Sequence, residues 1–224
     1  AENKFGISME DMDHVIDVAQ EMKNVKFIGL HFHIGSQILD MGDFVALCNR
    51  VNELLDKLEA RQIRIEHVNV GGGLGIDYGH PNRQPVPDFK SYFETYDNCL
   101  KLRPYQTLHF ELGRSVVGQC GSLIAKVLYV KQGTNKQFAI LDAGMTDLIR
   151  PALYQAFHKI ENITSDAPQQ TYDVVGPICE SSDVFGKAVD LNGVKRGDLI
   201  ALRSAGALRN HAAYVCLPHA SAPH

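Results

Sequence analysis

Several features that mark particular protein classes are absent from this sequence of 224 residues. There is no tryptophan, aromatic side chains make up only 8%, and the five cysteines include no CxxC pair. An odd, scattered set of cysteines argues against a disulfide framework and against a thiolate metal site. It fits a reducing compartment, and we expect a cytoplasmic protein.

Long apolar runs and blocks of like charge are also missing. No stretch approaches the roughly 20 apolar residues that span a bilayer, and the first residues lack the basic-then-apolar layout of a signal peptide. The formal net charge is only −4. We therefore expect no nucleic-acid or membrane partner, and a small molecule or another protein subunit remains. An apolar content of 45% suits one large domain or two smaller ones.

Helical and strand patterns alternate in the first half of the chain. The expected elements are helices at 8–22 (with Ser8 as its cap), 44–58 and 88–102, and strands at 25–32, 63–70 and 107–111. Such alternation is typical of parallel β/α units, which place their chemistry at the carboxyl ends of the strands.

The second half has the pattern of a mostly β domain. The expected strands are 116–130, 138–142, 172–175 and 198–203, with a short helix at 151–158. The predicted fold class is therefore α/β followed by all-β, with the boundary near residues 112–118. About three β/α units precede this boundary, whereas a barrel needs eight. We expect that the chain lacks the start of a barrel.

A glycine-rich loop at 71–75 follows one of the expected strands. Glycine amides can approach an anion closely and form a phosphate-binding nest, although a tight turn would use the same residues. The dinucleotide fingerprint requires a helix directly after the glycines, and residues 77–81 (DYGHP) are a poor helix start. A phosphate ligand other than a dinucleotide is favoured.

Two pairs of polar residues lie near strand ends. His31 and His33 share one face of a strand, but no Cys or acidic neighbour completes a ligand set, so we expect no metal site. Glu111 and Arg114, taken alone, would form a surface ion pair that contributes at most about 1 kcal/mol.

A loop of small residues at 176–183 places a thiol, Cys179, beside a carboxylate, Glu180. One interpretation is a capped turn with a buried cysteine. The other is a substrate-facing thiol and acid, which would require a perturbed cysteine pKa.

The order of these motifs along the chain is more specific than any one of them. The segments are 29–37 (GLHFHIGSQ), 69–75 (NVGGGLG), 111–115 (ELGRS), 142–144 (DAG), 150–154 (RPALY) and 176–183 (GPICESSD). Together they resemble the diaminopimelate decarboxylases, pyridoxal-phosphate-dependent enzymes of the alanine-racemase-like fold. The resemblance extends from about residue 4 to residue 207.

The resemblance implies a domain organisation and an activity. Residues 1–114 would be the C-terminal part of a β/α (TIM-like) barrel, 115–207 a β-sandwich or β-barrel domain, and 208–224 an atypical tail. The activity would be decarboxylation of meso-2,6-diaminopimelate to L-lysine and CO2 in lysine biosynthesis. The cofactor would be pyridoxal 5'-phosphate, and the enzyme would be a homodimer.

The resemblance also implies which residues bind the cofactor: His33, Ser36, Gly71, Gly72, Gly73, Glu111, Gly113 and Arg114. His33 would lie against one face of the cofactor ring, and Ser36 with the glycine amides would hold the phosphate. Glu111 would face the pyridine nitrogen and keep it protonated, so that the ring can accept the electrons left when CO2 departs.

The implied substrate site combines three cationic or hydroxyl groups with an acid and a thiol. Arg114, Arg150 and Tyr154 would grip the distal carboxylate, because a planar guanidinium group matches a carboxylate bidentately. Glu180 would meet the distal ammonium group, and Cys179 would lie beside the reacting carbon as a proton donor. Cys179 and His33 are the two catalytic candidates. In the family Cys179 and Glu180 come from the neighbouring subunit, which a symmetric dimer supplies reciprocally.

Three departures from the family pattern qualify these expectations. The family's Schiff-base lysine lies upstream of residue 1, so we expect this chain alone to be inactive. The resemblance stops after Ala207, where the family continues with Tyr-Gly. Codons that encode the following residues, read one base later, give this Tyr-Gly. We therefore hypothesise that 208–224 is out of frame, and resequencing the gene would decide this. Leu112 replaces a proline that is usual in the family.

Alternative functions remain open. Cys179 followed by Glu180, together with the segment at 150–154, favours a substrate with a second carboxylate over ornithine. The alternatives are a decarboxylase of another basic amino acid (the ornithine, arginine or carboxynorspermidine type), a catalytically inactive regulatory relative, and a nucleotide-binding α/β module.

Overall fold

The computed structural model describes residues 5–207, which fold into two compact units. Within the described residues, the α/β unit takes in 5–35, 40–72 and 91–111, and the β unit takes in 36–39, 73–90 and 112–207. The domain limits that the sequence suggests at 114 and 207 stay a prediction, and the atypical tail lies outside the described residues. Of the helices in the described chain, none has the length and apolarity needed to cross a membrane.

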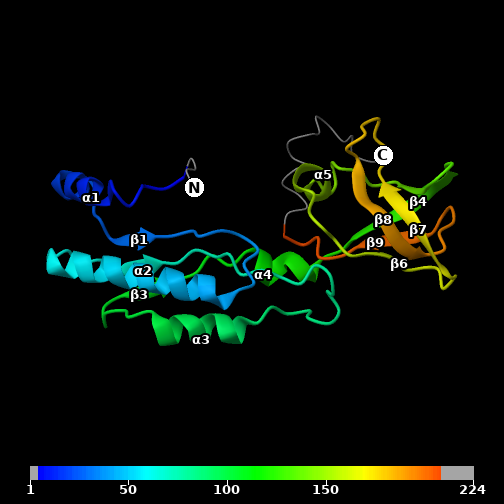
Figure 1. Cartoon of the computed structure of the whole chain (residues 1–224). Helices are drawn as coiled ribbons and strands as arrows, with labels where there is room; N and C mark the ends of the chain where they lie inside the picture. Colours follow the sequence, from blue (N-terminus) through cyan, green and yellow to red (C-terminus); the bar gives the residue numbers. More distant parts are fainter. Residues whose placement is uncertain (1–4, 208–224) are drawn as a thin grey trace, which may run out of the picture. The chain divides into compact units, whose positions relative to one another are not determined.

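The α/β unit is built on a parallel three-stranded sheet in the order β1-β2-β3. Its strands are β1 (Gly29–His31), β2 (His67–Asn69) and β3 (Thr107–His109), and its helices are α1 (Met12–Glu21), α2 (Met41–Ala60) and α3 (Phe89–Cys99) (Figure 1). The predicted alternation of helix and strand is therefore confirmed, although each strand is shorter than the apolar run that predicted it.

Helix α2 provides much of the core of this unit. Asp40 caps its start by accepting a hydrogen bond of 2.8 Å from the amide of Gly42. Its apolar residues recur three or four positions apart, and burying each large one stabilises the fold by roughly 1.5–3 kcal/mol. The buried side chains are Phe44, Leu47, Cys48, Val51, Leu54, Leu55 and Leu58. The ring centroid of Phe44 lies 4.9 Å from that of Tyr92 on α3, in an edge-to-face contact.

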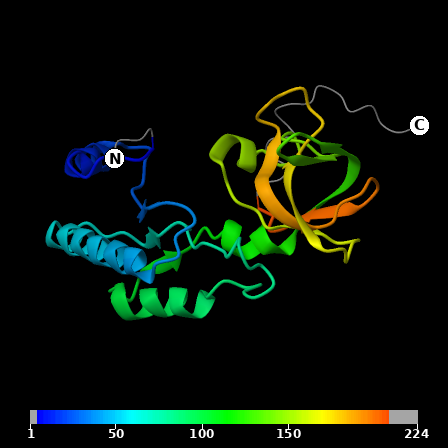
Figure 2. The same ribbon diagram turned by 45° about the vertical axis from the view of Figure 1, so that its right-hand side comes forward.

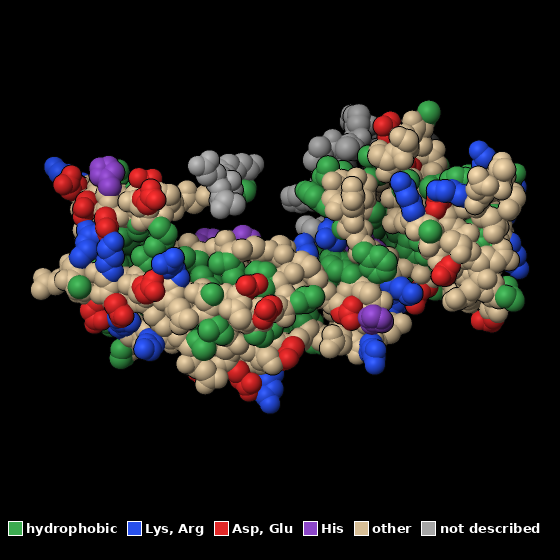
Figure 3. Space-filling model, in the orientation of Figure 1, with side chains coloured by type: hydrophobic (Ala, Val, Ile, Leu, Met, Phe, Trp, Pro, Cys, Tyr) green, Lys and Arg blue, Asp and Glu red, His purple; other side chains and the backbone are tan. Residues whose placement is uncertain are grey.

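The predicted cap of the first helix was wrong. Asp11, not Ser8, occupies the N-cap position of α1, and the Ser8 hydroxyl donates to a carboxylate oxygen of Asp11 at 3.0 Å. Exposed ion pairs join α1 to α2, including one of 2.6 Å between Lys57 and Asp13. Such surface pairs each contribute about 0–1 kcal/mol. Acidic and basic side chains are intermixed over the visible face of both units (Figure 3).

The β unit is a six-stranded sheet in the order β6-β9-β4-β5-β7-β8. Its elements are α4 (Arg114–Val117), η1 (Gly118–Cys120), β4 (Leu123–Gln132), β5 (Gln137–Leu141), α5 (Arg150–Tyr154), β6 (Ile160–Asn162), β7 (Gln169–Val175), β8 (Val184–Asn192) and β9 (Leu199–Leu202). Only β5 and β7 pair in parallel; the other neighbours are antiparallel. The two edge strands β6 and β8 also contact each other, so the strongly curved sheet nearly closes (Figure 2).

The core of the β unit lies inside this curved sheet. Residues along β4 alternate between buried and exposed, as expected for a strand with one face against a core. Inward side chains from several strands pack there, including Leu123, Leu141, Tyr172, Phe185 and Ile200.

One sequence expectation for this unit was wrong, and two strands were missed. Residues 114–120 are helical, and β4 begins only at Leu123, because the amides of Val116 and Val117 both bond to the carbonyl of Gly113 at 3.1 Å. The β-branched run had suggested a strand. Strands β6 and β8 were not predicted. The pairing of β8 with β7 shifts register, and Ala188 in β8 has a φ of +50°. No regular alternation of apolar and polar residues therefore marks β8 in the sequence.

Candidate functional site

The carboxyl ends of β1, β2 and β3 bring parts of the first three motifs of the sequence together in the α/β unit. His31, Asn69 and His109 are paired across the sheet. Beyond the last ladder positions, the amide of Glu111 donates to the carbonyl of Gly71 at 2.7 Å. The glycine loop and Glu111 are therefore direct neighbours, although they are 40 residues apart in sequence.

Asn69 connects this pair through its side chain. Its amide nitrogen donates to Oε1 of Glu111 at 2.9 Å, and its amide oxygen accepts from the amide of Gly71 at 2.8 Å. His31 Nε2 lies 3.2 Å from Oε2 of the same carboxylate. The Glu111 side chain is still about half exposed, at 53%. Its oxygens keep free lone pairs for a further donor. Asn69 belongs to the motif at 69–75, but no role was predicted for it from the sequence.

The glycine loop has a backbone that other residues do not easily adopt. Gly71 has a φ of +69° and Gly73 a φ of +103°. A Cβ on Gly71 would lie 2.4 Å from the carbonyl oxygen of Phe32 and 3.3 Å from Nδ1 of His33. His33 is exposed and therefore lies beside the loop. A cradle without side chains next to a fixed carboxylate suits a ligand with a phosphate group and a protonated ring nitrogen.

Ser36 belongs to the β unit, in the short segment 36–39. Ile38 in this segment bonds to the carbonyl of Gly73 at 2.9 Å and to the amide of Gly75 at 2.8 Å. This pairing holds the segment beside the second half of the glycine loop, and the Ser36 side chain is exposed there. Gly113 precedes α4, and a Cβ built on it would meet open space.

Two arginines share one aromatic ring in the β unit. Arg114 and Arg150 are the first residues of α4 and α5. Their guanidinium carbons lie 6.0 and 5.0 Å from the ring centroid of Tyr78. Arg114 Nη1 donates to Oε1 of Gln37 at 3.1 Å, and Arg150 Nη1 donates to the Tyr78 hydroxyl at 2.9 Å. Within residues 5–207, neither guanidinium forms a salt bridge with a carboxylate.

The environment of Arg114 is unfavourable for an unpaired charge. Burial, with a smaller contribution from Arg150, lowers the pKa of its guanidinium, against an opposing effect of Tyr78. Its Nε–H is buried and has no hydrogen-bond partner in the described chain. A buried, unmatched donor costs about 1–3 kcal/mol, more when it carries charge. Two cations without a counter-charge and one orphaned donor indicate a place for an anion.

His158 is a further member of this cluster that was not predicted from the sequence. Its Nδ1 lies 2.9 Å from the carbonyl of Arg203, and its Nε2 lies 3.2 Å from Nη1 of Arg150. The ring meets that of Tyr78 edge-on at 5.1 Å. Burial, and secondarily the charges of Arg150 and Arg114, lower its pKa. Apart from its position eight residues after Arg150, nothing in the sequence pointed to a role for His158 in this cluster.

Tyr154 is not brought to the arginines within the described chain. It lies at the end of α5, and its side chain is 68% exposed. The role expected for it in binding a carboxylate stays a prediction.

The loop that carries Cys179 and Glu180 is fixed at its base by Asp183. One oxygen of this buried carboxylate accepts from the amide of Met145 at 2.6 Å and the other from the amide of Ile178 at 2.9 Å. The side chains of Cys179 and Glu180 are both exposed. Asp183 therefore joins Met145, directly after the motif at 142–144, to the motif at 176–183, while the thiol and the acid remain at the surface.

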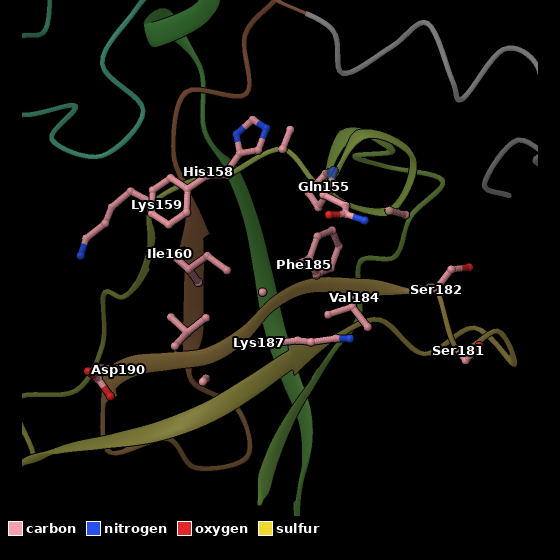
Figure 4. A pocket seen from close by; sticks show the side chains of 17 residues that line it. Gln155, His158, Lys159, Ile160, Ser181, Ser182, Val184, Phe185, Lys187 and Asp190 are labelled. Carbon is pink, nitrogen blue, oxygen red and sulfur yellow. The ribbon is translucent and has the colours of Figure 1, made fainter.

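A cavity of about 720 Å³ in the β unit lies between the segment that follows α5 and strand β8. Figure 4 shows the His158 ring at the upper edge of this cavity, with Phe185, Val184 and Lys187 below it. Ser181 and Ser182, which belong to the loop at 176–183, also line it, whereas Arg114 and Arg150 do not.

His31, the last residue of β1, and His33, two residues beyond it, do not gather further metal ligands. Across the part of the chain that the structure describes, no three His, Cys, Asp or Glu side chains come together as a metal site. His31 is paired with Glu111 instead.

Comparison with known proteins places these features in a family. A family model described as "Pyridoxal-dependent decarboxylase, C-terminal sheet domain" matches residues 14–206. The chain is 87% identical over 207 residues to a diaminopimelate decarboxylase of Bacteroides thetaiotaomicron, covering 92% of this chain and 54% of that protein. The chain thus spans about half the length of the curated relatives it matches.

Solved structures agree with this assignment. The crystal structure of diaminopimelate decarboxylase from Helicobacter pylori, complexed with L-lysine, is 37% identical with a TM-score of 0.84 and covers 95% of this chain and 52% of that one. A lysine/ornithine decarboxylase from Vibrio vulnificus, complexed with cadaverine, has a TM-score of 0.82 at 24% identity, covers 95% of this chain and 57% of that one, and shares the fold. The chain belongs to the pyridoxal-dependent decarboxylase family.

Proposed function

We propose that the product of the complete gene decarboxylates meso-2,6-diaminopimelate to L-lysine and CO2, with pyridoxal 5'-phosphate as cofactor. The observation that carries this proposal is the 87% identity with the Bacteroides thetaiotaomicron diaminopimelate decarboxylase. The lysine-bound relative from Helicobacter pylori supports it. Because the chain spans about half the length of its relatives, the activity is proposed for the whole gene product.

The cofactor contacts follow from the α/β unit. When bound, pyridoxal phosphate supplies a ring that accepts the electron pair released as CO2 departs. Glu111, oriented by Asn69 and His31, would receive the ring N–H and keep it protonated. The amides of Gly71, Gly72 and Gly73, with the Ser36 hydroxyl, would donate to the phosphate, and the glycine cradle leaves room for it.

Three other cofactor contacts remain proposals. His33, which lies beside Gly71, would cover one face of the ring. The backbone of Gly113 and the side chain of Arg114 would border the cofactor from the turn after Glu111.

The arginine pair is proposed to select a substrate with a second carboxylate. Among residues 5–207 the acceptors that hold Arg114 and Arg150 are neutral, so an arriving carboxylate would neutralise both arginines and occupy the orphaned Nε–H of Arg114. A guanidinium binds a carboxylate bidentately. Ornithine has no second carboxylate to offer. Tyr154 would add a hydroxyl donor to this contact.

The exposed loop at 176–183 is proposed to act across a dimer. Glu180 would receive the distal ammonium group of the substrate, and Cys179 would donate its thiol proton to the carbon that has lost CO2, leaving a thiolate. Both side chains are exposed while Asp183 fixes the base of the loop, an arrangement that suits delivery to a neighbouring subunit. A symmetric homodimer would supply two such sites reciprocally.

We also propose that the α/β unit is the C-terminal part of a β/α barrel and that the enzyme is cytoplasmic. The parallel strands with intervening helices support the barrel. The scattered cysteines support the reducing compartment.

The decisive experiment is to express the complete gene, load the product with pyridoxal phosphate and measure lysine formation from meso-diaminopimelate. Ornithine and arginine, tested at equal concentration, are the matched controls. We expect lysine formation with little conversion of either control. Preferential consumption of ornithine or arginine would overturn the substrate assignment.

A further inference from the structure

Arg150 is held by two acceptors at a single nitrogen. Its Nη1 donates both to the Tyr78 hydroxyl at 2.9 Å and to Nε2 of His158 at 3.2 Å. A guanidinium nitrogen of this kind carries two N–H groups, so both are occupied. The remaining side of the guanidinium, formed by Nε and Nη2, is the edge that binds a carboxylate bidentately. Within residues 5–207 neither of these two nitrogens has a hydrogen-bond partner.

The hydrogen bonds of His158 define its protonation state. A carbonyl oxygen can only accept, so Nδ1 carries the proton that is donated to Arg203. A guanidinium can only donate, so Nε2 must be the unprotonated nitrogen that accepts from Arg150. The imidazole is therefore neutral in this arrangement. Burial and the two nearby arginines, which lower its pKa, keep it in that form.

The neutrality of both acceptors has a chemical consequence. An Asp or Glu in place of His158 would hold Arg150 equally well but would cancel its charge. Tyr78 and His158 fix the direction of the guanidinium without neutralising it, and Gln37 does the same for Arg114. The charge thus remains available to a ligand while its geometry is set in advance, which reduces the ordering cost of binding.

We propose that Tyr78 and His158 are positioning residues that hold the Nε–Nη2 edge of Arg150 toward the retained carboxylate of the substrate, and so set the preference for ligands with that carboxylate. This inference rests on the proposed function. It assigns roles to two residues that act through Arg150 and do not touch the reacting atoms.

The test uses two product-like diamines that differ in one group. L-lysine keeps the carboxylate that decarboxylation leaves behind, and cadaverine lacks it. The product of the complete gene, loaded with cofactor, is assayed with each as a competitive inhibitor, in the wild type and in His158→Phe, which keeps a flat ring against Tyr78 but has no acceptor. We expect the inhibition constant of lysine to rise about tenfold, as for the loss of one hydrogen bond to a charged group, and that of cadaverine to stay unchanged.

Two further variants separate positioning from general damage. His158→Gln places an amide oxygen near the position of Nε2, and we expect it to restore most of the lysine affinity. Tyr78→Phe keeps the ring and removes the hydroxyl, and we expect a smaller change in the same direction. The KM for diaminopimelate should rise in parallel with kcat nearly constant. Equal weakening of lysine and cadaverine, or no rescue by His158→Gln, would overturn the proposal.

A measurement on the wild type keeps this inference separate from the proposed function. Nitrogen-15 chemical shifts report which ring nitrogen of His158 carries the proton. A protonated Nδ1 with a bare Nε2 supports the proposal even if diaminopimelate is not the substrate. A protonated Nε2 would overturn it even if the enzyme forms lysine. Absence of lysine formation alone would instead remove the proposed function.

Discussion

The α/β unit and the β unit orient the charged side chains of their candidate sites in a similar way, although the charges have opposite signs. In the α/β unit Glu111 is oriented by Asn69 and by His31. In the β unit Arg150 is oriented by Tyr78 and His158. Neither charge is paired with a permanently charged opposite partner among the described residues.

Structural charges in the same units behave differently. Arg103 donates to both Asp56 and Glu59 at 2.6 Å, and Lys136 donates to Asp173 at 2.9 Å. These ions are neutralised by their neighbours. Arg150 differs from these ions because Tyr78 and His158 hold it without neutralising it, which leaves its charge available to a ligand.

The largest effect is expected when Glu111, the candidate cofactor-binding carboxylate of the α/β unit, loses its charge. Glu111→Gln keeps the shape and the contact with Asn69 but cannot keep a ring nitrogen protonated. We expect kcat for diaminopimelate to fall by about a hundredfold to a thousandfold, the scale for losing one preorganised electrostatic contact. Steady-state kinetics on the loaded product of the complete gene measure this. Glu66→Gln, an exposed substitution before β2, is the control, and an equal loss there would refute the prediction.

The next effect tests the comparison of free and neutralised arginines directly. Arg150→Met should lower kcat/KM for diaminopimelate about a hundredfold, since a charge-assisted bidentate contact is lost. Arg103→Met removes an arginine that is already neutralised, so kcat/KM should stay within about twofold and stability should change by about 1 kcal/mol or less. Similar catalytic losses in both variants would break the comparison.

A smaller effect is expected from the backbone of the glycine loop. Gly71→Ala forces a Cβ to within 2.4 Å of the Phe32 carbonyl at a φ of +69°. The free energy of unfolding should fall by about 1–3 kcal/mol, as measured by urea denaturation. Gly79→Ala, whose Cβ would meet its nearest neighbour at an ordinary 3.4 Å, should change it by less than about 1 kcal/mol. Equal changes in the two variants would show that the loop tolerates a side chain.

The smallest effect is expected in the pH dependence of stability, through the ion pair of Asp173 with Lys136. Burial acts to raise the pKa of Asp173, but hydrogen bonds from Lys136 and from the Ala188 amide outweigh it, so the net pKa is lowered from 3.8. A lowered folded-state pKa gives stability that is present above pH 3.8 and is lost as the pH falls through the folded value. Urea denaturation at pH 7 and pH 3 should show this loss in the wild type and a reduced loss in Asp173→Asn. An identical pH dependence in both proteins would contradict the assignment.

Local pattern predicted much of the secondary structure. The apolar residues of α2 recur at helical spacing, and the seven buried ones lie on one face, so the sequence was sufficient to identify it. Val116 and Val117 led to the wrong prediction of a strand, because their strand propensity was outweighed by turn hydrogen bonds to Gly113. Strand β8 was not predicted because its register shifts disrupt the regular alternation of apolar and polar residues.

The order of motifs along the chain was enough to indicate the family, since each motif is a short segment whose residues are read directly from the sequence. Which groups meet was decided only by tertiary structure. Tyr78 and Arg150 are 72 residues apart, and Gln37 and Arg114 are 77 residues apart. Local periodicity fixes which face of a helix or strand is apolar, but a hydrogen bond between distant segments depends on how the whole unit packs. The neutral partners of the two arginines could therefore be found only in the folded chain.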